Sequence, residues 1–288
     1  MKFTFMRTYR HEFSISGMCR ALEVVRGSYY SWCSRAESNK KKRDKFLTAE
    51  ISAAHEKSRR IYGSPKIHRE LCSRGIKCGH NRIAKLMKLN GIRAKMTKRF
   101  KKQFSSVGDA VAAPNVVNRN FNPKSRDLVY VLDTTFVWTS IGWAYLCACI
   151  DLFNKEVIGW HVSKHCDAEA AVTTLDKAIQ RRKPSAGLIV HTDRGSQFDS
   201  AAFKKIIKDN DFVRSMSRKG NCWDNACAES FFGHLKTEWL TGMIFNATYE
   251  VHSACFDYIE VFYNRKRQHA SLGYVSPADY GKDVRKIA

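Results

Sequence analysis

The chain has 288 residues, of which 44% are hydrophobic and 12% aromatic, with only 5 prolines. These values predict one large or two ordinary folded domains and exclude a disordered or collagen-like chain. Residues 1–126 contain 30 basic and 8 acidic residues, a net charge of +22, whereas the remaining residues have a net charge of +1. A basic half joined to a nearly neutral half indicates a polyanionic partner, with a merely soluble basic surface as the alternative.

The sequence predicts a cytoplasmic protein. Residues 1–13 contain no apolar stretch typical of a secretory signal, and the best apolar run, 143–150, is far shorter than the roughly 20 residues of a membrane span. We therefore expect no membrane partner and ten cysteines kept as thiols. His68, Cys72, Cys78 and His80 are possible zinc ligands, but their spacing matches no familiar zinc motif. Ordinary surface or half-buried residues are the favoured interpretation there.

Helical periodicity begins at the N-terminus. Residues 1 to about 36 are predicted to be helical, with a break at Gly27-Ser28. The four basic residues at 40–43 predict a solvated junction, and a second helix is expected from Leu47 onward. We define 1–45 as an N-terminal helical segment.

Two helices with clearer start and stop signals follow. Ser64 is a suitable N-cap and Pro65 suits the first helical position, so a helix is predicted to run to Arg74 and stop at Gly75. A second helix is predicted from residue 80 or 81 to about Leu89. Two short helices joined by a tight turn predict a helix-turn-helix DNA-binding domain over 46–95.

Basic side chains on these helices are candidate DNA contacts. Arg82, Lys85 and Lys88 recur at three-residue steps along one side of the second helix, which predicts a surface that faces DNA. The alternative, that these cations only solvate the helix, stays open. Further contacts are expected from Lys66, Arg69, Lys98 and Arg99. Residues 96–124 are basic and polar and predict a linker.

The second half is rich in strand-forming residues. Runs of branched and aromatic residues predict an antiparallel meander over 128–139, 143–153 and 156–162. Helices at 167–182 and 200–208 and strands at 187–190 and 212–216 are expected to follow. This order predicts a mixed α/β domain at 125–240, followed by a C-terminal helix and basic tail at 241–288.

Three acidic residues stand out by their placement. Asp133 interrupts the first strand, and a carboxylate buried there must be hydrogen-bonded, paired or bound to metal. Asp193 follows the strand at 187–190, where an ordinary turn residue is the alternative. Glu229 lies on a helix that starts near a cap-like Asp224, and Lys236, seven residues later, shares its face. An ordinary solvated helix face remains the alternative for this pair.

The motifs around these acids resemble those of the Asp, Asp, Glu transposases and integrases. They are DTTF at Asp133, HTDRGSQF around Asp193 and NACAESFFGHLK around Glu229. More narrowly, the chain is similar to the second-frame product (OrfB) of insertion sequences whose transposase is assembled from two overlapping reading frames. YGSPKIHREL, NRIAKLMKLNGI and YNRKRQHASLGYVSPADY extend the resemblance over almost the whole chain. Departures from the family pattern at Tyr130, Thr134 and Thr192 remove no carboxylate.

The resemblance implies a fold and an activity. The fold would be an RNase H-like integrase catalytic core, with a mixed five-stranded sheet and helices, preceded by an α-helical helix-turn-helix region. Asp133, Asp193 and Glu229 would hold two Mg²⁺ ions, which Mn²⁺ can replace, because phosphodiester transfer needs charge stabilisation and hard oxygen ligands select such ions. The implied reaction is DNA strand cleavage and strand transfer in the transposition and integration of an insertion sequence.

The resemblance also implies partners. These are the terminal repeats of the element, target DNA, further copies of the chain, and the first-frame product or a frameshift fusion with it. Lys236 is expected to hold terminal DNA, and Arg265, Lys266 and Arg267 are expected to contact phosphates. The expected location is the bacterial nucleoid. A catalytically inactive DNA-binding regulator and a ribonuclease of the same fold are the alternative functions.

Overall fold

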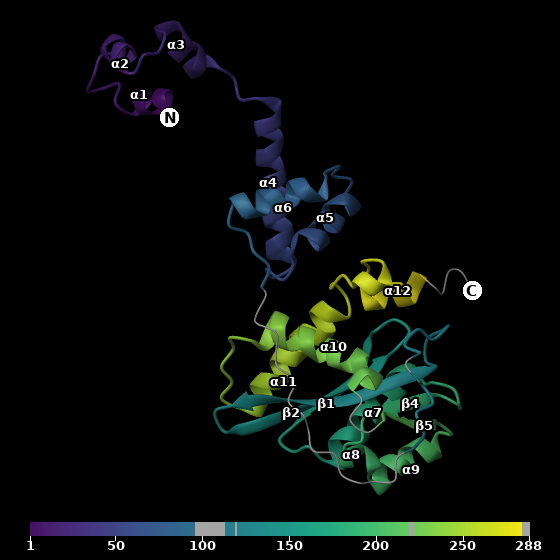
Figure 1. Ribbon diagram of the computed structural model, residues 1–288. Coiled ribbons are helices and arrows are strands. Elements are labelled where there is room, and N and C mark those ends of the chain that lie inside the picture. Colours follow the sequence, from purple (N-terminus) through teal and green to yellow (C-terminus); the bar gives the residue numbers. More distant parts are fainter. Residues whose placement is uncertain (96–112, 119, 219–221, 284–288) are drawn as a thin grey trace.

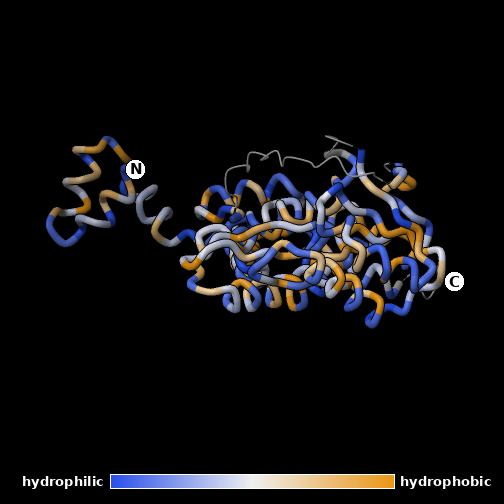
Figure 2. The backbone as a smooth tube through the Cα atoms, turned by 90° about the horizontal axis from the view of Figure 1, so that it is seen from below, coloured by the Kyte–Doolittle hydropathy of each residue, from blue (hydrophilic) through white to orange (hydrophobic). Residues whose placement is uncertain are grey.

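The N-terminal helices form a small unit of their own. The computed structural model describes residues 1–95, 113–118, 120–218 and 222–283. The first helices are α1 (Lys2–Thr8), α2 (Ile15–Ala21) and α3 (Arg26–Ser34). They enclose a separate core around Met6 and Tyr29 and project away from the rest of the chain (Figures 1 and 2). The predicted break at Gly27-Ser28 is wrong, because this pair lies in the first turn of α3.

The helix-turn-helix prediction is confirmed, with an earlier start. The helices are α4 (Asn39–Lys57), α5 (Ser64–Ser73) and α6 (His80–Leu89). The basic run at 40–43 belongs to α4 rather than to a junction, because the Ser38 hydroxyl accepts the Lys41 amide and caps the helix there. The boundary predicted at residue 45 therefore falls inside α4. Gly63, not Ser64, is the N-cap residue of α5.

A five-stranded mixed sheet lies at the centre of the second half (Figure 1). Its strands are β1 (Val129–Thr139), β2 (Gly142–Asp151), β3 (Val157–Ser163), β4 (Ile189–Thr192) and β5 (Val213–Met216). Their order is β3-β2-β1-β4-β5, in which β1, β2 and β3 pair antiparallel and β4 runs parallel to both β1 and β5. The predicted meander and the predicted RNase H-like architecture are confirmed.

Helices cover both faces of this sheet. On one face lie α7 (Ala168–Arg182), α8 (Ser196–Asp199) and α9 (Ala201–Asp209), and on the other lie α10 (Ala226–Leu235) and α11 (Thr248–Phe256). Successive residues of a strand point to opposite faces. Tyr130 and Leu132 accordingly join the core beneath α7, whereas Val129 and Val131 join the core beneath α10. Asp133 continues the second series and is directed toward α10.

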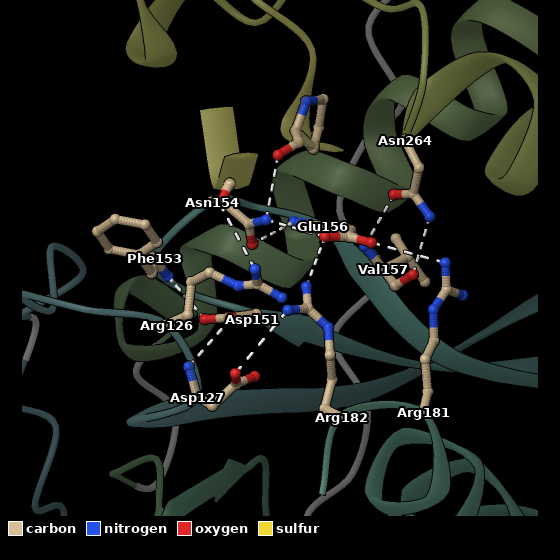
Figure 3. Close-up of polar contacts among 12 residues, drawn as sticks. Arg126, Asp127, Asp151, Phe153, Asn154, Glu156, Val157, Arg181, Arg182 and Asn264 are labelled. Atoms are coloured by element: carbon tan, nitrogen blue, oxygen red, sulfur yellow. Dashed lines mark hydrogen bonds and ion pairs between the residues drawn. The ribbon is translucent and has the colours of Figure 1, made fainter. Parts of the chain in front are cut away.

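Residues after α10 are tied to the edge of the sheet, and we call 236–283 the C-terminal segment. It includes π-helical turns at Lys236–Leu240 and Asp257–Tyr263, a 3-10 turn at Ala270–Leu272 and α12 (Pro277–Asp283). The Asn264 side chain both accepts from and donates to the backbone of Val157, at 3.0 and 2.9 Å (Figure 3). Nearby, Glu156 is paired with Arg181 and Arg182. Residues beyond 240 are therefore part of the folded core.

The helix-turn-helix region packs against this C-terminal segment. Arg59 forms an ion pair with Asp257 at 2.6 Å, and the Gln268 amide donates to the Tyr62 hydroxyl at 2.7 Å. The hydrophobic cores of the two regions join in one cluster. None of the helices in the described part of the chain is long and apolar enough to span a bilayer.

Candidate active site

Asp133 and Asp193 lie side by side because of the strand register. Leu132 of β1 pairs with Thr192 of β4 in a parallel ladder, and each aspartate is the residue that follows. The Asp133 Oδ1 accepts the Thr134 amide at 2.7 Å, and the Asp193 Oδ1 accepts the Gly195 amide at 2.9 Å. Two residues 60 positions apart in the sequence thus present carboxylates at one place.

The electrostatics of this place disfavour negative charge. Burial, then the neighbouring Asp193 and Glu229 carboxylates, raise the pKa of Asp133 well above its ordinary value. Burial also raises the pKa of Asp193, against the opposing hydrogen bond from Gly195. Carboxylates converge here from β1, from the end of β4 and from α10. Such a group is stabilised by a cation.

Glu229 is brought to the site by the start of α10. His191 in β4 is buried, and its ring contacts the Ser215 hydroxyl at 2.9 Å and the Asp224 carbonyl at 3.0 Å. Asp224 is also buried, and its carboxylate pairs with Arg218 at 2.8 Å. Asp224 thus anchors the turn before α10, rather than capping the helix, whose N-cap is Asn225. This turn fixes the direction in which α10 leaves the sheet.

Lys236 lies at the junction of α10 and the first π-helical turn. Its Nζ is 5.1 Å from the centre of the Phe136 ring, on the same strand as Asp133. Burial lowers the pKa of Lys236, and the charge of Asp133 opposes this shift. The structure therefore brings Lys236 into the electrostatic range of the acidic group, as the shared helix face predicted.

The three carboxylates are less tightly clustered than a group of ligands elsewhere in the described chain. Among the described residues, three possible ligand atoms lie within 4.8 Å of one another only at His68, Cys72 and Cys78. The oxygens of Asp133, Asp193 and Glu229 are therefore spread more widely.

The predicted DNA contacts of the helix-turn-helix region differ in exposure. Lys85 and Lys88 on α6 and Arg69 on α5 are exposed. Arg82 is half-buried and pairs with Asp44 of α4 at 2.8 Å. Lys66 is half-buried, where burial, then the charge of Arg267, lowers its pKa to about 8. Its amine is directed to the interface with the C-terminal segment, and the predicted residues Lys98 and Arg99 lie outside the described part of the chain.

The three predicted phosphate contacts near the C-terminus differ in exposure. Arg265 and Lys266 are exposed. Arg267 is only 3% exposed, and its guanidinium donates to both oxygens of Glu238, at 2.7 and 2.6 Å. The predicted phosphate contact by Arg267 is therefore corrected, because this side chain is committed to an internal ion pair.

Sequence reasoning missed the residues that anchor the site. His191, Arg218 and Glu238 were assigned no role, although each makes a specific polar contact. His191 had a usable signal, because it is a polar residue in an apolar strand directly before the Asp193 motif. The Arg218 and Glu238 pairs had none, because their partners became known only through the fold.

Family comparisons agree with this architecture. Integrase core domain models match residues 123–222 and 229–284, and an HTH-like domain model matches 41–100. The 31 kDa protein of insertion element IS600 from Shigella sonnei is 38% identical, with coverage of 94% of this chain and 100% of the relative. The transposase InsF for insertion sequence IS3A from Escherichia coli is 35% identical, over 97% and 98% of the two chains.

A solved structure is similar at a lower level. The HTLV-2 integrase catalytic core domain in complex with magnesium has 14% sequence identity and a TM-score of 0.43, over 55% of this chain and 98% of that one. The sheet and the matches to integrase core and HTH-like domain models define an integrase-type recombination protein with a helix-turn-helix region. The chain belongs to the family of insertion-sequence transposases that includes InsF of IS3.

Proposed function

We propose that the chain cleaves DNA at the ends of an insertion sequence and joins those ends to target DNA, with Asp133, Asp193 and Glu229 as the catalytic carboxylates. The observation that carries this proposal is the convergence of the three acids. The parallel register sets Asp133 beside Asp193, and the charges of Asp193 and Glu229 raise the pKa of Asp133. A fold rarely keeps like charges together unless a ligand compensates them.

The donor set fits a pair of hard divalent cations. Asp133, Asp193 and Glu229 offer carboxylate oxygens, which Mg²⁺ and Mn²⁺ prefer. We assign both Mg²⁺ ions to these three residues, with Mn²⁺ as a substitute. When bound, such ions stabilise negative charge on the attacking and leaving oxygens of a phosphodiester.

The chain's own residues position the DNA. In the first step the oxygen of a water molecule bonds to phosphorus, the bond to the 3′ oxygen breaks, and that oxygen gains a proton. In the second step the freed 3′-OH bonds to a target phosphorus and displaces another 3′ oxygen. We assign to Lys236, whose charge interacts with that of Asp133, the binding of a terminal phosphate, and to the exposed Lys85 and Lys88 the binding of the DNA backbone. No covalent bond to the protein is needed.

The proposal includes the wider assembly. We assign DNA binding to the helix-turn-helix region, which starts with α4 at Asn39 and extends to residue 95. We assign catalysis to the sheet and its helices from residue 125, together with the C-terminal segment that packs on them. Of the predicted linker at 96–124, residues 96–112 and 119 lie outside the described part of the chain, and Val117 is buried in the core. Further copies of the chain and the first-frame product, or a fusion with it, are the proposed protein partners. Because this activity requires bacterial DNA, the proposed location of the protein is the nucleoid.

A strand-transfer assay tests the proposal. The full chain is incubated with Mg²⁺ and a duplex bearing the element's terminal repeat, with and without the first-frame product. We expect cleavage and joining by the wild type and by Asp209→Asn, a change in an exposed residue of α9. Asp193→Asn is expected to lower both steps by about a thousandfold, because it removes a cation ligand that contributes several kcal/mol.

Two results would count against this function. Strand transfer that persists in Asp193→Asn contradicts the assignment of the carboxylates. DNA binding without cleavage by the wild type, even with the first-frame product, supports the regulator instead. Cleavage of RNA in a hybrid without joining of DNA supports the ribonuclease.

A further inference from the structure

Three soft ligands converge on the helix-turn-helix region, far from the acidic group. One ligand atom each of His68, Cys72 and Cys78 lies within 4.8 Å of the other two. His68 and Cys78 are half-buried and Cys72 is exposed, so the cluster lies at the protein surface. The spacing of these residues along the sequence matches no zinc motif. The fold nevertheless brings their side chains close together.

The local backbone explains this convergence. His68 and Cys72 are four residues apart on α5, so they lie on the same face of the helix. The chain reverses at Gly75, whose φ of +78° is one that glycine adopts readily, and the Ile76 amide bonds back to the Leu71 carbonyl at 3.0 Å. Cys78 then returns to His68, whose Nε2 donates to the Cys78 carbonyl at 3.1 Å.

One ligand separation already matches that of a tetrahedral zinc site. Zinc bonds of about 2.3 Å to sulfur and 2.0–2.1 Å to nitrogen set neighbouring ligand atoms about 3.3–3.8 Å apart. The Cys72 Sγ and the His68 Nε2 are 3.5 Å apart. The remaining separations are at most 4.8 Å, so rotation of side chains is enough to close the site.

His80, at the start of α6, lies outside the group of ligand atoms within 4.8 Å but close to it, and is a candidate fourth ligand. The ring centres of His68 and His80 are 5.9 Å apart, close to the value of about 5 Å that two imidazoles on one tetrahedral ion would have. The Nε2 of His80 contacts the Ser64 hydroxyl at 3.2 Å, which leaves its Nδ1 for a metal. Such a hydrogen bond from the second ring nitrogen is typical of histidine ligands.

We propose that His68, Cys72, Cys78 and His80 bind one structural Zn²⁺ ion. Binding releases a proton from each thiol and replaces the hydrogen bond of His68 to the Cys78 carbonyl. Two thiolates and two neutral imidazoles give a neutral complex. Arg43, which donates to the carbonyl of Lys77 at 3.0 Å, supplies positive charge that favours the thiolates.

The zinc would fasten the turn of the helix-turn-helix. Two of its ligands come from α5, one from the turn and one from the first residue of α6. The ion would therefore fix the angle at which α6 presents Lys85 and Lys88. Its role is independent of the acidic group on the sheet, because the two sites share no residue.

Metal content of the full chain tests this proposal. Protein is purified under reducing conditions, filtered through a gel with a weak chelator and analysed by mass spectrometry for zinc. We expect one zinc per chain in the wild type, in Asp133→Asn, and in Cys33→Ser, which alters an exposed cysteine of α3. Cys72→Ser and Cys78→Ser are expected to lower zinc affinity at least about tenfold. Loss of a residue that only hydrogen-bonds to a metal ligand already costs about that much, and loss of the ligand itself should cost more.

Cobalt substitution supplies a second readout. Co²⁺ in the site should give a thiolate charge-transfer absorption that Cys72→Ser and Cys78→Ser abolish. Cys166→Ser is the control, because Cys166 is the exposed thiol within electrostatic range of Asp133 and Asp193. No retained zinc in the wild type, or equal retention in the Cys72→Ser protein, overturns the site. Full affinity in His80→Ala overturns the fourth ligand.

Discussion

Two groups of buried or half-buried carboxylates in the same domain have opposite surroundings. Where β1 and β4 stop pairing, Asp133 and Asp193 accept backbone amides, and burial raises the pKa of both. The charges of Asp193 and Glu229 raise the pKa of Asp133 further. In the C-terminal segment, Glu238 faces Arg267 and the Tyr258 hydroxyl. Burial alone would raise the pKa of Glu238, but the bond and charge of Arg267 lower it below its ordinary value. Arg267 compensates the charge of the second group from within the chain, whereas we propose that divalent cations compensate the first.

The largest expected effect comes from breaking the internally compensated group. Glu238→Gln leaves the guanidinium of Arg267 buried without its counter-charge, which should lower the free energy of unfolding by about 3–5 kcal/mol. Urea unfolding of the full chain measures this change. Glu56→Gln is the control, because it breaks an exposed ion pair with Arg60, where the expected loss is below about 1 kcal/mol. Equal losses in the two variants would contradict the contrast between the two groups.

Asp151 lies between the two extremes and should give stability a pH dependence. It is fully buried and accepts the amides of Phe153 and Asp127, yet burial raises its pKa to about 7 (Figure 3). Between about pH 4 and 7 the native state keeps a proton that the unfolded chain has lost, so stability should fall by about 2–4 kcal/mol as pH rises and then level off.

Asp151→Asn should reduce this pH dependence by the contribution of Asp151, while Asp133 and Asp193, whose pKa values are also raised, keep the rest. Unfolding free energies at several pH values across that range, for the wild type and the variant, measure the difference. Asp209→Asn, a substitution of an exposed residue, should keep the wild-type slope of unfolding free energy against pH. An unchanged slope in Asp151→Asn would show that another group titrates.

Neutralising Asp133, which lies within β1, should stabilise the fold. In the presence of a chelator at pH 8, Asp133→Asn removes a charge that burial, Asp193 and Glu229 disfavour, so the midpoint of urea unfolding should rise. Because the pKa of Asp133 is raised in the folded state, the gain should shrink as the pH falls toward the ordinary value of an aspartate. A lower midpoint would mean that the ionised carboxylate supports the fold, as in the Glu238 group.

The sequence predicted the carboxylate group better than the ion-paired group, for a physical reason. Asp133 and Asp193 sit at the ends of apolar runs that already read as strands, and a parallel register brings such ends together. Glu238 lies in the first π-helical turn, and Arg267, 29 residues later, lies in an irregular segment after the second. No periodicity in the sequence predicts their contact. Arg267 was therefore predicted to be a DNA contact from its neighbours in sequence alone.

Local sequence signals carry little information where the chain turns. The basic residues at 40–43 suggested a solvated junction, which was wrong because a Ser38 cap allows charged residues to begin a helix. The spacing of Cys72 and Cys78 matched no zinc motif, and it gave no sign that a reversal at Gly75 brings the two residues together. Their proximity depends on how the chain turns, which spacing does not encode.

The smallest expected effect separates exposed from buried cations within the predicted DNA-binding surface. Lys88 is exposed on α6, so Lys88→Ala should weaken binding to all DNA sequences and lower the slope of log affinity against log salt by about 0.9. Lys66 packs over the Tyr62 ring at 5.0 Å, and its pKa of about 8 leaves it partly neutral under mildly alkaline conditions. Lys66→Ala should therefore change the slope far less. Fluorescence anisotropy over a range of salt concentrations measures both slopes, and a larger change in Lys66→Ala would mean that the helix-turn-helix leaves the C-terminal segment when it binds DNA.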